Sequence, residues 1–495
     1  MFGGQPMSPR ATHALLLTAA AVWLSALFWN SLGIPFLADD YEFLKVAAEM
    51  ASPLDAFRGG HTSPKPLHHL IFWWGAHATG PDPAWMRVPG FLAHGLALCF
   101  VFRLAKQAGA SVGHAAAAAI LYAAFATTRS LYWPVAISGF LRVTCALAAL
   151  SFYVDATRKL SAALLAVSFT LLAMAAHQSG ALMPVFFVMW SVLIGSGGLG
   201  ERALRGVHAA LHPVVLTALA IVVAYFFWAA RTPDQYRGFR DLGAIAANTL
   251  RGLVALAPDS LRMHAVEAAR GQAKGVAFAL GWATVLCCAA FYGWRLVRGS
   301  GIWRFAIVAG ACDIALGVVT AGYSQRYAYL AGALLAIALA TSATQATNGR
   351  HRAGWLAGMV VLFAAWLSET WRITRELRDA GTVLNSILDR AERTSRDLGP
   401  DSPLVVVNAP DVWGKEHDLP LLNWGLEPAL RMRGIQRPIR QVRTTPARTS
   451  TAQSLISAAE LEKLRQTSGG EVLVFDQEAK QVVRWLHGTK LAESR

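Results

Sequence analysis

Three carboxylates stand close together directly after the first long apolar stretch of the chain. Asp39, Asp40 and Glu42 follow the apolar run 11–30, which is long enough to cross a bilayer at about 1.5 Å of rise per residue. Charged residues beside a lipid-crossing helix are costly to place, and they usually mark an active site, an ion path or a water-filled cavity. A solvated loop is the plainer interpretation. We treat the acidic cluster as a candidate site at the membrane surface, on the side opposite the N-terminus.

A carboxylate pair at a membrane surface suits a general base, a metal ligand or a proton relay. A general base for glycosyl transfer needs one ionised carboxylate within hydrogen-bond reach of the acceptor hydroxyl. A second acid nearby raises the pKa of its partner or holds a metal. The spacing leaves the individual roles open. A helix places Asp39 and Glu42 on one face, whereas an extended segment places Asp40 and Glu42 on one face.

Cationic side chains on the same side of the membrane suit a phosphate group. Arg326 lies between two tyrosines at the end of an apolar run, next to Tyr327, and a guanidinium presents a fork of donors to a pair of phosphate oxygens. The further candidates for binding an anionic substrate are His61, Lys65, Arg129 and His177. Snorkelling toward lipid headgroups is the alternative for Arg129, and a local hydrogen bond is the alternative for His177.

Composition sets the class of protein that must position these groups. The 495 residues are 55% hydrophobic and 15% charged, whereas a soluble domain carries roughly 25% charge. Repeated apolar runs of about 20 residues predict a polytopic helical membrane protein with about eleven transmembrane helices. The predicted spans are 11–30, 84–105, 113–127, 133–154, 160–176, 180–197, 211–229, 273–294, 303–321, 326–343 and 354–370.

Positive charge indicates which loops face the cytoplasm. Alternate loops carry Lys and Arg close to span ends, which marks that side as cytoplasmic. The segments 31–83 and 231–272 then lie on the outer side, together with the C-terminal tail. From Trp371 onward the chain has 19 Lys and Arg against 16 Asp and Glu, so most of the net charge of +15 lies among the spans. This distribution gives little support to a nucleic-acid partner.

The chain divides into a membrane domain and a small soluble domain. Residues 1–370 hold the spans, 371–400 form an amphipathic helical linker, and 401–495 form an α/β domain. Within this domain we expect a buried strand at 404–407, a helix at 452–466 and a strand pair at 471–476 and 481–486. Its arginine run (Arg431, Arg433, Arg437, Arg440, Arg443 and Arg448) is either a solvated or membrane-facing basic surface or a docking site for an anionic glycan or headgroup.

One short segment and the cysteines remain to be placed. The apolar run 66–79 is too short to span the bilayer and is bracketed by prolines, which predicts an interfacial or re-entrant helix on the outer side. All five cysteines lie within apolar segments, and no Cys or His spacing typical of a metal site is present.

Three short segments, in this order and on one side of the membrane, resemble the GT-C superfamily of polytopic glycosyltransferases. This superfamily includes protein O-mannosyltransferases and bacterial transferases that modify lipid A and O-antigen. The first segment is Ala38-Asp39-Asp40-Tyr41, and the second runs from Lys65-Pro66-Leu67 through Gly80-Pro81 to a span with an internal His94. The third is Arg326-Tyr327-Ala328-Tyr329-Leu330. The chain departs from the pattern at His177-Gln178, where many relatives have Lys-Glu, and at Lys65, where the usual residue is Arg.

The resemblance implies a GT-C-like membrane domain and a reaction. A polyprenyl-phosphate-linked sugar would hold its phosphate near Arg326 and Lys65, while Asp39, assisted by Asp40, deprotonates an acceptor hydroxyl of a cell-envelope lipid, glycan or protein. Metal dependence varies within the superfamily, so the resemblance leaves a divalent cation undecided. Alanine-rich and arginine-rich usage suggests a bacterial source, and we expect a multi-pass inner-membrane protein with a periplasmic C-terminal domain.

Two other classes are compatible with the sequence. An O-antigen ligase or polymerase would use outer-loop arginines and histidines, which the segment 231–272 supplies. A polytopic transporter or flippase would place acids near the bilayer midplane and would show broken-helix repeats. The charges recognised in the sequence gather at the outer surface, which favours the transferase.

Overall fold

The computed structural model describes most of the chain. The described residues are 9–37, 39–58, 65–78, 80–125, 131–156, 158–194, 197–229, 250–257, 259–269, 271, 273–321, 328–397, 403–410, 412–413, 419–420, 422, 425–444, 454–457, 459–461, 463, 472–476, 481–486 and 489–490. Of the residues singled out above, His61, Arg129, Arg326, Tyr327 and Arg448 lie outside this set, as does all of 231–249.

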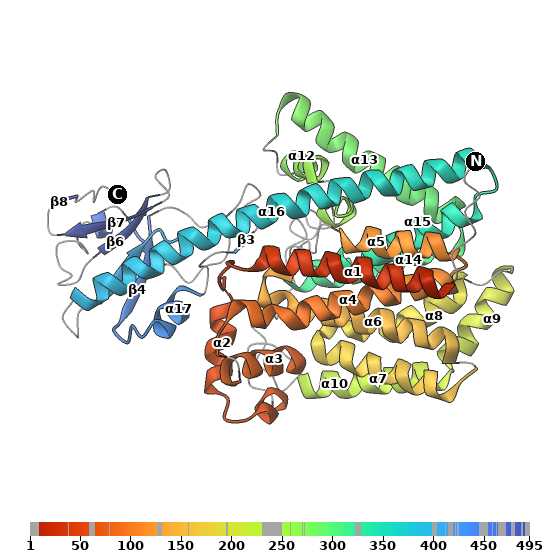
Figure 1. The fold of residues 1–495 in the computed structure, drawn as a ribbon, viewed down its shortest axis with the longest axis horizontal. Coiled ribbons are helices and arrows are strands. Elements are labelled where there is room, and N and C mark those ends of the chain that lie inside the picture. Colours follow the sequence, from red (N-terminus) through yellow and green to blue (C-terminus); the bar gives the residue numbers. More distant parts are fainter. Residues whose placement is uncertain are drawn as a thin grey trace.

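Helices make up the membrane domain (Figure 1). In chain order they are α1 (Pro9–Ser31), α2 (Asp39–Glu49), η1 (Pro53–Phe57), α3 (Pro66–His77), α4 (Pro83–Gln107), α5 (Val112–Ala123), η3 (Pro134–Ala136), α6 (Ile137–Ala156), α7 (Leu160–Ala176), η4 (Gln178–Leu182), α8 (Met183–Ile194), α9 (Leu199–Ala210), α10 (Pro213–Ala229), α12 (Asp259–Ala269), α13 (Gly275–Arg298), α14 (Gly301–Ala321), α15 (Tyr329–Gln345) and α16 (Gly349–Asp397).

Within the described residues, every predicted span overlaps one of these helices, in two cases together with the short 3-10 turn before it. Among the described helices, four are long and apolar enough to cross a membrane, namely Pro83–Gln107, Pro134–Ala156, Gly275–Arg298 and Gly349–Arg396. The pair α9 and α10, bent by 58°, would add a fifth. The apolar helices confirm a polytopic helical membrane protein, while the number of eleven spans stays a prediction.

The short outer helix predicted at 66–79 is present as α3. Pro66 occupies its first turn, where the missing N–H costs no hydrogen bond. The next helix, α4, begins at Asp82, whose side chain accepts a hydrogen bond from the Ala84 N–H. Helices α2 and α3 pack against each other and cover the end of the bundle that faces the C-terminal sheet (Figure 1).

One helix joins the two parts of the molecule. The sequence predicted a span at 354–370 followed by an amphipathic helical linker at 371–400, and α16 joins the two as one helix that ends at Asp397. At 1.5 Å per residue its 49 residues extend about 74 Å. The predicted apolar face is confirmed, because Ile373, Leu377, Ala380, Leu384, Ile387 and Ala391 are all buried. The apolar stripe stays buried against other parts of the protein beyond residue 370. This burial stabilises the helical conformation there, so the helix continues past the membrane span.

The C-terminal part contains a mixed six-stranded sheet of order β5-β4-β1-β6-β7-β8, with a separate hairpin of β2 and β3. The strands are β1 (Leu404–Val407), β2 (Val412–Trp413), β3 (Leu419–Pro420), β4 (Ile439–Arg443), β5 (Ser454–Leu455), β6 (Val472–Asp476), β7 (Gln481–Leu486) and β8 (Thr489–Lys490), and α17 (Leu426–Met432) precedes β4. The predicted strand at 404–407 and the predicted pair of β6 and β7 are confirmed. The helix predicted at 452–466 is wrong at 454–455, which pair with β4 as β5.

Candidate active site

The acidic cluster forms the first turn of α2, so the helical alternative holds. Asp39 and Glu42 are half-buried on one face, whereas Asp40 points into the protein and is fully buried. Carboxylates in the first turn of a helix are stabilised by the N-terminal end of its dipole. The two aspartates therefore occupy different environments, although they are neighbours in the chain.

Asp40 serves as a structural acceptor. Its Oδ2 accepts a hydrogen bond from the Leu37 N–H at 2.9 Å, and its Oδ1 accepts one from the Val135 N–H at 2.8 Å. Burial raises the pKa of Asp40 to about 8, while the two N–H donors and the nearby Arg87 guanidinium act in the opposite direction. Both carboxylate oxygens are thus committed to backbone groups that hold the start of α2 against η3. An acceptor hydroxyl would reach Asp39 before it reached Asp40.

Arg87, near the start of α4, fixes the same connection and was not recognised in the sequence. Its side chain is buried and donates to the carbonyl oxygens of Tyr132 (2.7 Å), Ser31 (3.1 Å), Ile34 (2.7 Å) and Pro35 (3.0 Å). A planar guanidinium can serve several carbonyls at once, whereas an ammonium cannot. An arginine close to the start of an apolar helix was the available signal, but its carbonyl partners belong to segments that are distant in the sequence.

We expect Arg87→Lys to destabilise the protein by about 2 kcal/mol, because lysine keeps the charge but leaves buried carbonyls without donors. Thermal unfolding in detergent measures the effect. Arg103→Lys is the matched control, since Arg103 lies on the same helix and pairs with a partly exposed Asp155 at 2.7 Å. An exposed pair of this kind contributes less than about 1 kcal/mol. Equal loss of stability in the two variants would contradict a clamping role for Arg87.

The second predicted segment of the site lies beside the first. Lys65 is half-buried at the N-cap position of α3, and α3 packs on α2 through Phe43, whose ring lies 4.4 Å from that of His68 and 5.5 Å from that of Phe72. The structure thus brings the helix of Lys65 to the helix of Asp39. Two buried histidines of α3, His68 and His69, contribute to this interface and were also not recognised in the sequence.

His177 lies between α7 and η4. Its Nδ1 is 2.8 Å from the Ser179 Oγ and accepts a hydrogen bond from the Ser179 N–H at 3.2 Å, which caps the short turn. This is the local hydrogen bond that the sequence offered as the alternative for His177. A role in substrate binding stays a prediction for this residue.

The C-terminal part of the chain reaches the acidic helix directly. Helix α17 packs against α2, and Glu427 of α17 is among the charges that act on Glu42. Burial raises the pKa of Glu42, Lys45 lowers it, and Glu49, Asp39 and Glu427 raise it further. A carboxylate of the soluble domain therefore contributes to the electrostatics of α2.

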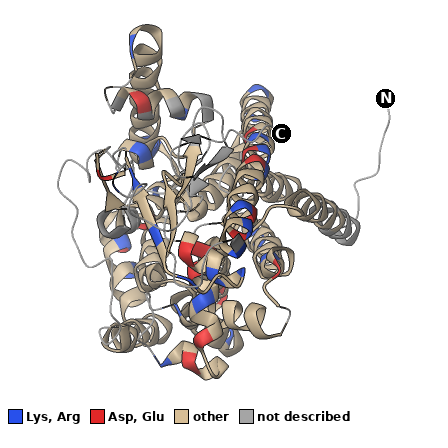
Figure 2. Cartoon of the chain, turned by 90° about the vertical axis from the view of Figure 1, so that its left-hand side faces the viewer, with Lys and Arg blue, Asp and Glu red and all other residues tan. Residues whose placement is uncertain are grey.

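The arginine run of the tail is largely occupied by contacts within the protein. Arg433 pairs with Asp389 (2.7 Å) and Glu392 (3.3 Å) of α16, and Arg431 pairs with Glu427 (3.3 Å). Figure 2, which faces the sheet end of the molecule, shows acidic and basic residues interspersed. Arg433 thus ties the segment after α17 to α16, whereas Arg431 pairs with a residue of its own helix. Neither of the two functions considered for the run in the sequence is needed to explain these contacts.

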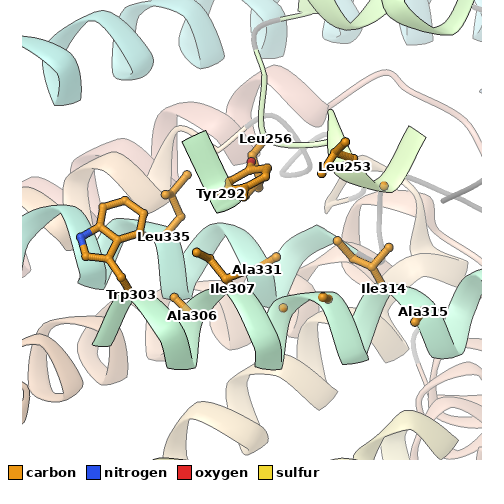
Figure 3. Close-up of a pocket in the computed structure, with 13 residues that line it drawn as sticks. Leu253, Leu256, Tyr292, Trp303, Ala306, Ile307, Ile314, Ala315, Ala331 and Leu335 are labelled. Atoms are coloured by element: carbon orange, nitrogen blue, oxygen red, sulfur yellow. The ribbon is translucent and has the colours of Figure 1, made fainter. Parts of the chain in front are cut away.

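An apolar groove opens along the membrane domain (Figure 3). It has a volume of about 210 Å³ and lies between the segment 252–256, Tyr292 of α13, and helices α14 and α15. Its lining runs along α14 from Trp303 to Ala315, a length of about 18 Å. The groove offers an apolar chain a continuous surface of Leu, Ile and Ala side chains. Among the described residues, no group of three or more His, Cys, Asp or Glu side chains could hold a metal ion.

A solved structure shares the architecture of nearly the whole chain. No protein-family model and no curated protein matches the sequence. The crystal structure of ArnT from Cupriavidus metallidurans in the apo state is 13% identical, covers 95% of this chain and 94% of its own, and has a TM-score of 0.50. The same protein bound to undecaprenyl phosphate is 13% identical, covers 98% and 97%, and has a TM-score of 0.49. The Archaeoglobus fulgidus oligosaccharyltransferase in the apo form is 13% identical, covers 86% and 64%, and has a TM-score of 0.46.

At this level of identity the match to apo ArnT bears on the fold, and it extends over nearly the full length of both chains. It includes the membrane helices together with the C-terminal part, in agreement with the resemblance drawn from three short sequence segments. The chain is a polytopic helical membrane protein that shares its fold with ArnT from Cupriavidus metallidurans.

Proposed function

We propose that this protein is a glycosyltransferase that moves a sugar from a polyprenyl-phosphate donor to a hydroxyl group of a cell-envelope acceptor. The observation that carries the proposal is the placement of Asp39 on the GT-C fold. It is a half-buried carboxylate at the start of a helix, held by the buried Asp40 and Arg87 at the end of the bundle that faces the soluble domain. The reaction would take place at the periplasmic face of a bacterial inner membrane.

The proposed reaction begins with Asp39 as general base. Its carboxylate takes the proton of the acceptor hydroxyl while that oxygen attacks the anomeric carbon. The bond between this carbon and the phosphate oxygen breaks, the configuration inverts, and polyprenyl phosphate leaves with the bonding electron pair. Lys65 and Arg326 are proposed to stabilise the charge that develops on the phosphate. The products are the glycosylated acceptor, polyprenyl phosphate and a proton that passes from Asp39 to solvent.

The donor's isoprenoid tail is proposed to lie in the apolar groove between α13, α14 and α15. A length of about 18 Å accommodates a few isoprene units, and the wall contains no charged residue. The soluble domain, whose α17 contacts α2, is proposed to present the acceptor to Asp39.

Release of polyprenyl phosphate tests the proposal. Purified wild-type protein and Asp39→Asn are incubated with a panel of polyprenyl-phosphate sugars, with and without cell-envelope acceptors. We expect release from at least one donor with the wild type and none with Asp39→Asn. Absence of release from every donor, with folded wild-type protein, would refute the glycosyltransferase assignment.

A groove variant tests where the lipid tail binds. Ala311→Trp fills the groove, whereas Ala290→Trp adds the same bulk on the exposed side of α13, away from the lining residues. We expect the first variant to raise the KM for the donor severalfold and the second to leave it unchanged. Equal KM values in both variants would place the tail elsewhere.

A further inference from the structure

Five polar side chains from five helices gather inside the membrane domain, away from the proposed site. They are His94 of α4, Tyr122 of α5, Arg142 of α6, Asp313 of α14 and Tyr329 of α15, and we call them the buried node. All five are buried. Ionisable groups within lipid-crossing helices are costly and generally have a function. The proposed reaction uses none of them directly.

The first half of the buried node is an ion pair. The Arg142 guanidinium meets the Asp313 carboxylate with both of its terminal nitrogens, and the Nη2–Oδ2 distance is 2.9 Å. The two side chains are 4% and 1% exposed, so the pair is shielded from water. A two-point pairing of planar groups fixes orientation as well as distance. It therefore sets how α14 lies against α6.

The second half joins two of the sequence segments that resemble the GT-C superfamily. His94 Nδ1 is hydrogen-bonded to the Tyr329 hydroxyl, although the residues are 235 positions apart. The Tyr329 ring packs edge-on against Phe140 of α6 at 4.3 Å and lies 5.0 Å from the Tyr122 ring. Arg142 follows Phe140 by two residues on α6, so the ion pair and the contacts of Tyr329 meet on the same helix.

The helices of the buried node lead to both ends of the proposed site. Helix α6 continues from η3, where the Val135 N–H binds the Asp40 carboxylate beside Asp39. Helix α15 begins at Tyr329, three residues after Arg326 in the chain. Tyr329 contacts α6 within one helical turn of its start, because Phe140 is the fourth residue of that helix. The buried node thus links the backbone at Val135, which holds Asp40 beside Asp39, to helix α15, which follows Arg326 in the chain.

We propose that the buried node is a positioning device that sets the separation between Asp39 and the start of α15, and with it the alignment of acceptor hydroxyl and donor phosphate. The proposal rests on the proposed function. The members of the buried node would act on Asp39 through Val135 and Asp40, and on the donor phosphate through the first turn of α15. A displacement of about 1 Å between reacting groups can slow a reaction about a hundredfold, so small shifts of the node have large effects on rate.

Tyr329→Phe tests the proposal, because it removes the hydroxyl that binds His94 and keeps the ring that packs on Phe140. The matched control is Tyr153→Phe, on α6, where a buried tyrosine hydroxyl bonds the Ser191 Oγ at 2.9 Å and its ring stacks on Phe187. We expect Tyr329→Phe to lower kcat about tenfold or more with an unchanged KM for the donor. Tyr153→Phe should keep the wild-type kcat. Equal kcat values in wild type and Tyr329→Phe would overturn the proposal.

Hydrogen exchange gives a readout that does not need activity. The amides of Leu37 and Val135 both donate to Asp40, so their exchange rates report how firmly α2 is held. We expect faster exchange at these two amides in Tyr329→Phe than in Tyr153→Phe. If wild-type protein releases no polyprenyl phosphate, the proposed function fails while exchange still decides this inference. Unchanged exchange at both amides would then refute it.

Discussion

Asp39→Asn is expected to lower kcat for sugar transfer by about a hundredfold to ten-thousandfold, the range that a positioned general base contributes. Asparagine has the shape of aspartate but cannot take the proton of the acceptor hydroxyl. Asp39 is half-buried, whereas Asp40 is fully buried and accepts two backbone N–H groups, so we expect Asp39→Asn to lower the thermal unfolding midpoint less than Asp40→Asn does. Single-turnover transfer and thermal unfolding on the same preparation measure both effects.

Asp40→Asn is the comparison that separates the two acids. Both Asp40 oxygens accept backbone N–H groups, so an amide NH₂ would face one of these donors and cost about 1–3 kcal/mol. We expect a lower unfolding midpoint together with partial activity in the protein that remains folded. Full loss of activity with normal stability in Asp40→Asn, and normal activity in Asp39→Asn, would reverse the assignment.

The stability of the wild-type protein and that of Asp40→Asn are expected to depend differently on pH. Because the folded-state pKa of Asp40 is raised to about 8 from 3.8, the folded protein holds this proton more tightly than the unfolded chain does. The stability contributed by protonated Asp40 is therefore present below about pH 4 and is lost as the pH rises through about 8. Relative to Asp40→Asn, the wild-type unfolding midpoint should fall over this interval and should stop changing above it.

Breaking the Arg142–Asp313 pair is expected to have the largest effect on stability. Arg142→Met leaves the Asp313 carboxylate buried without its partner, which costs about 3–5 kcal/mol. Arg142→Met combined with Asp313→Leu removes both charges, and replacing a buried pair by apolar residues is often neutral. We therefore expect the double variant to recover most of the unfolding midpoint that the single variant loses. Thermal or denaturant-induced unfolding in detergent measures both.

An exposed arginine provides the control for this comparison. Arg396 pairs with Glu392 on the surface of α16 and is 72% exposed, so Arg396→Ala should change stability by less than about 1 kcal/mol. Comparable losses in Arg142→Met and Arg396→Ala would show that burial does not govern the strength of the Arg142 pair. Failure of the double variant to recover would show that the apolar side chains do not fill the space of the pair.

The sequence was sufficient for features that depend on local pattern. Apolar runs predicted the helices, prolines predicted the short helix α3, and the 3.6-residue period predicted the buried face of α16 that includes Ile373 and Leu384. The end of the last membrane span was placed at residue 370 because the hydropathy of the sequence falls after that residue. Continuation of α16 depends instead on neighbours that a hydropathy profile does not include.

The features that escaped prediction depend on contacts between distant segments. Asp39 and Asp40 have the same side chain and are neighbours in the chain. They differ in role because Val135, 95 residues away, donates a backbone hydrogen bond to Asp40. Arg87 is recognisable only when the carbonyls of Ser31 and Tyr132 come together around it. The sequence also led us to place the charges at the outer surface, but Arg142 and Asp313 lie buried within the bundle, because each neutralises the other there.

The unbroken course of α16 determines how the two halves of the molecule meet. A hinge needs a residue whose backbone can change conformation. In the second half of α16 the glycine that could serve is Gly381. It packs so closely against Pro35 that an added Cβ would lie 2.3 Å from the Pro35 Cδ. Arg378 also donates to the Asn30 carbonyl at 2.8 Å. The sheet domain is therefore carried at a fixed orientation, so the entropy of aligning it with α2 is lost once, during folding. An acceptor held by that domain would meet Asp39 at a high effective concentration in every catalytic cycle.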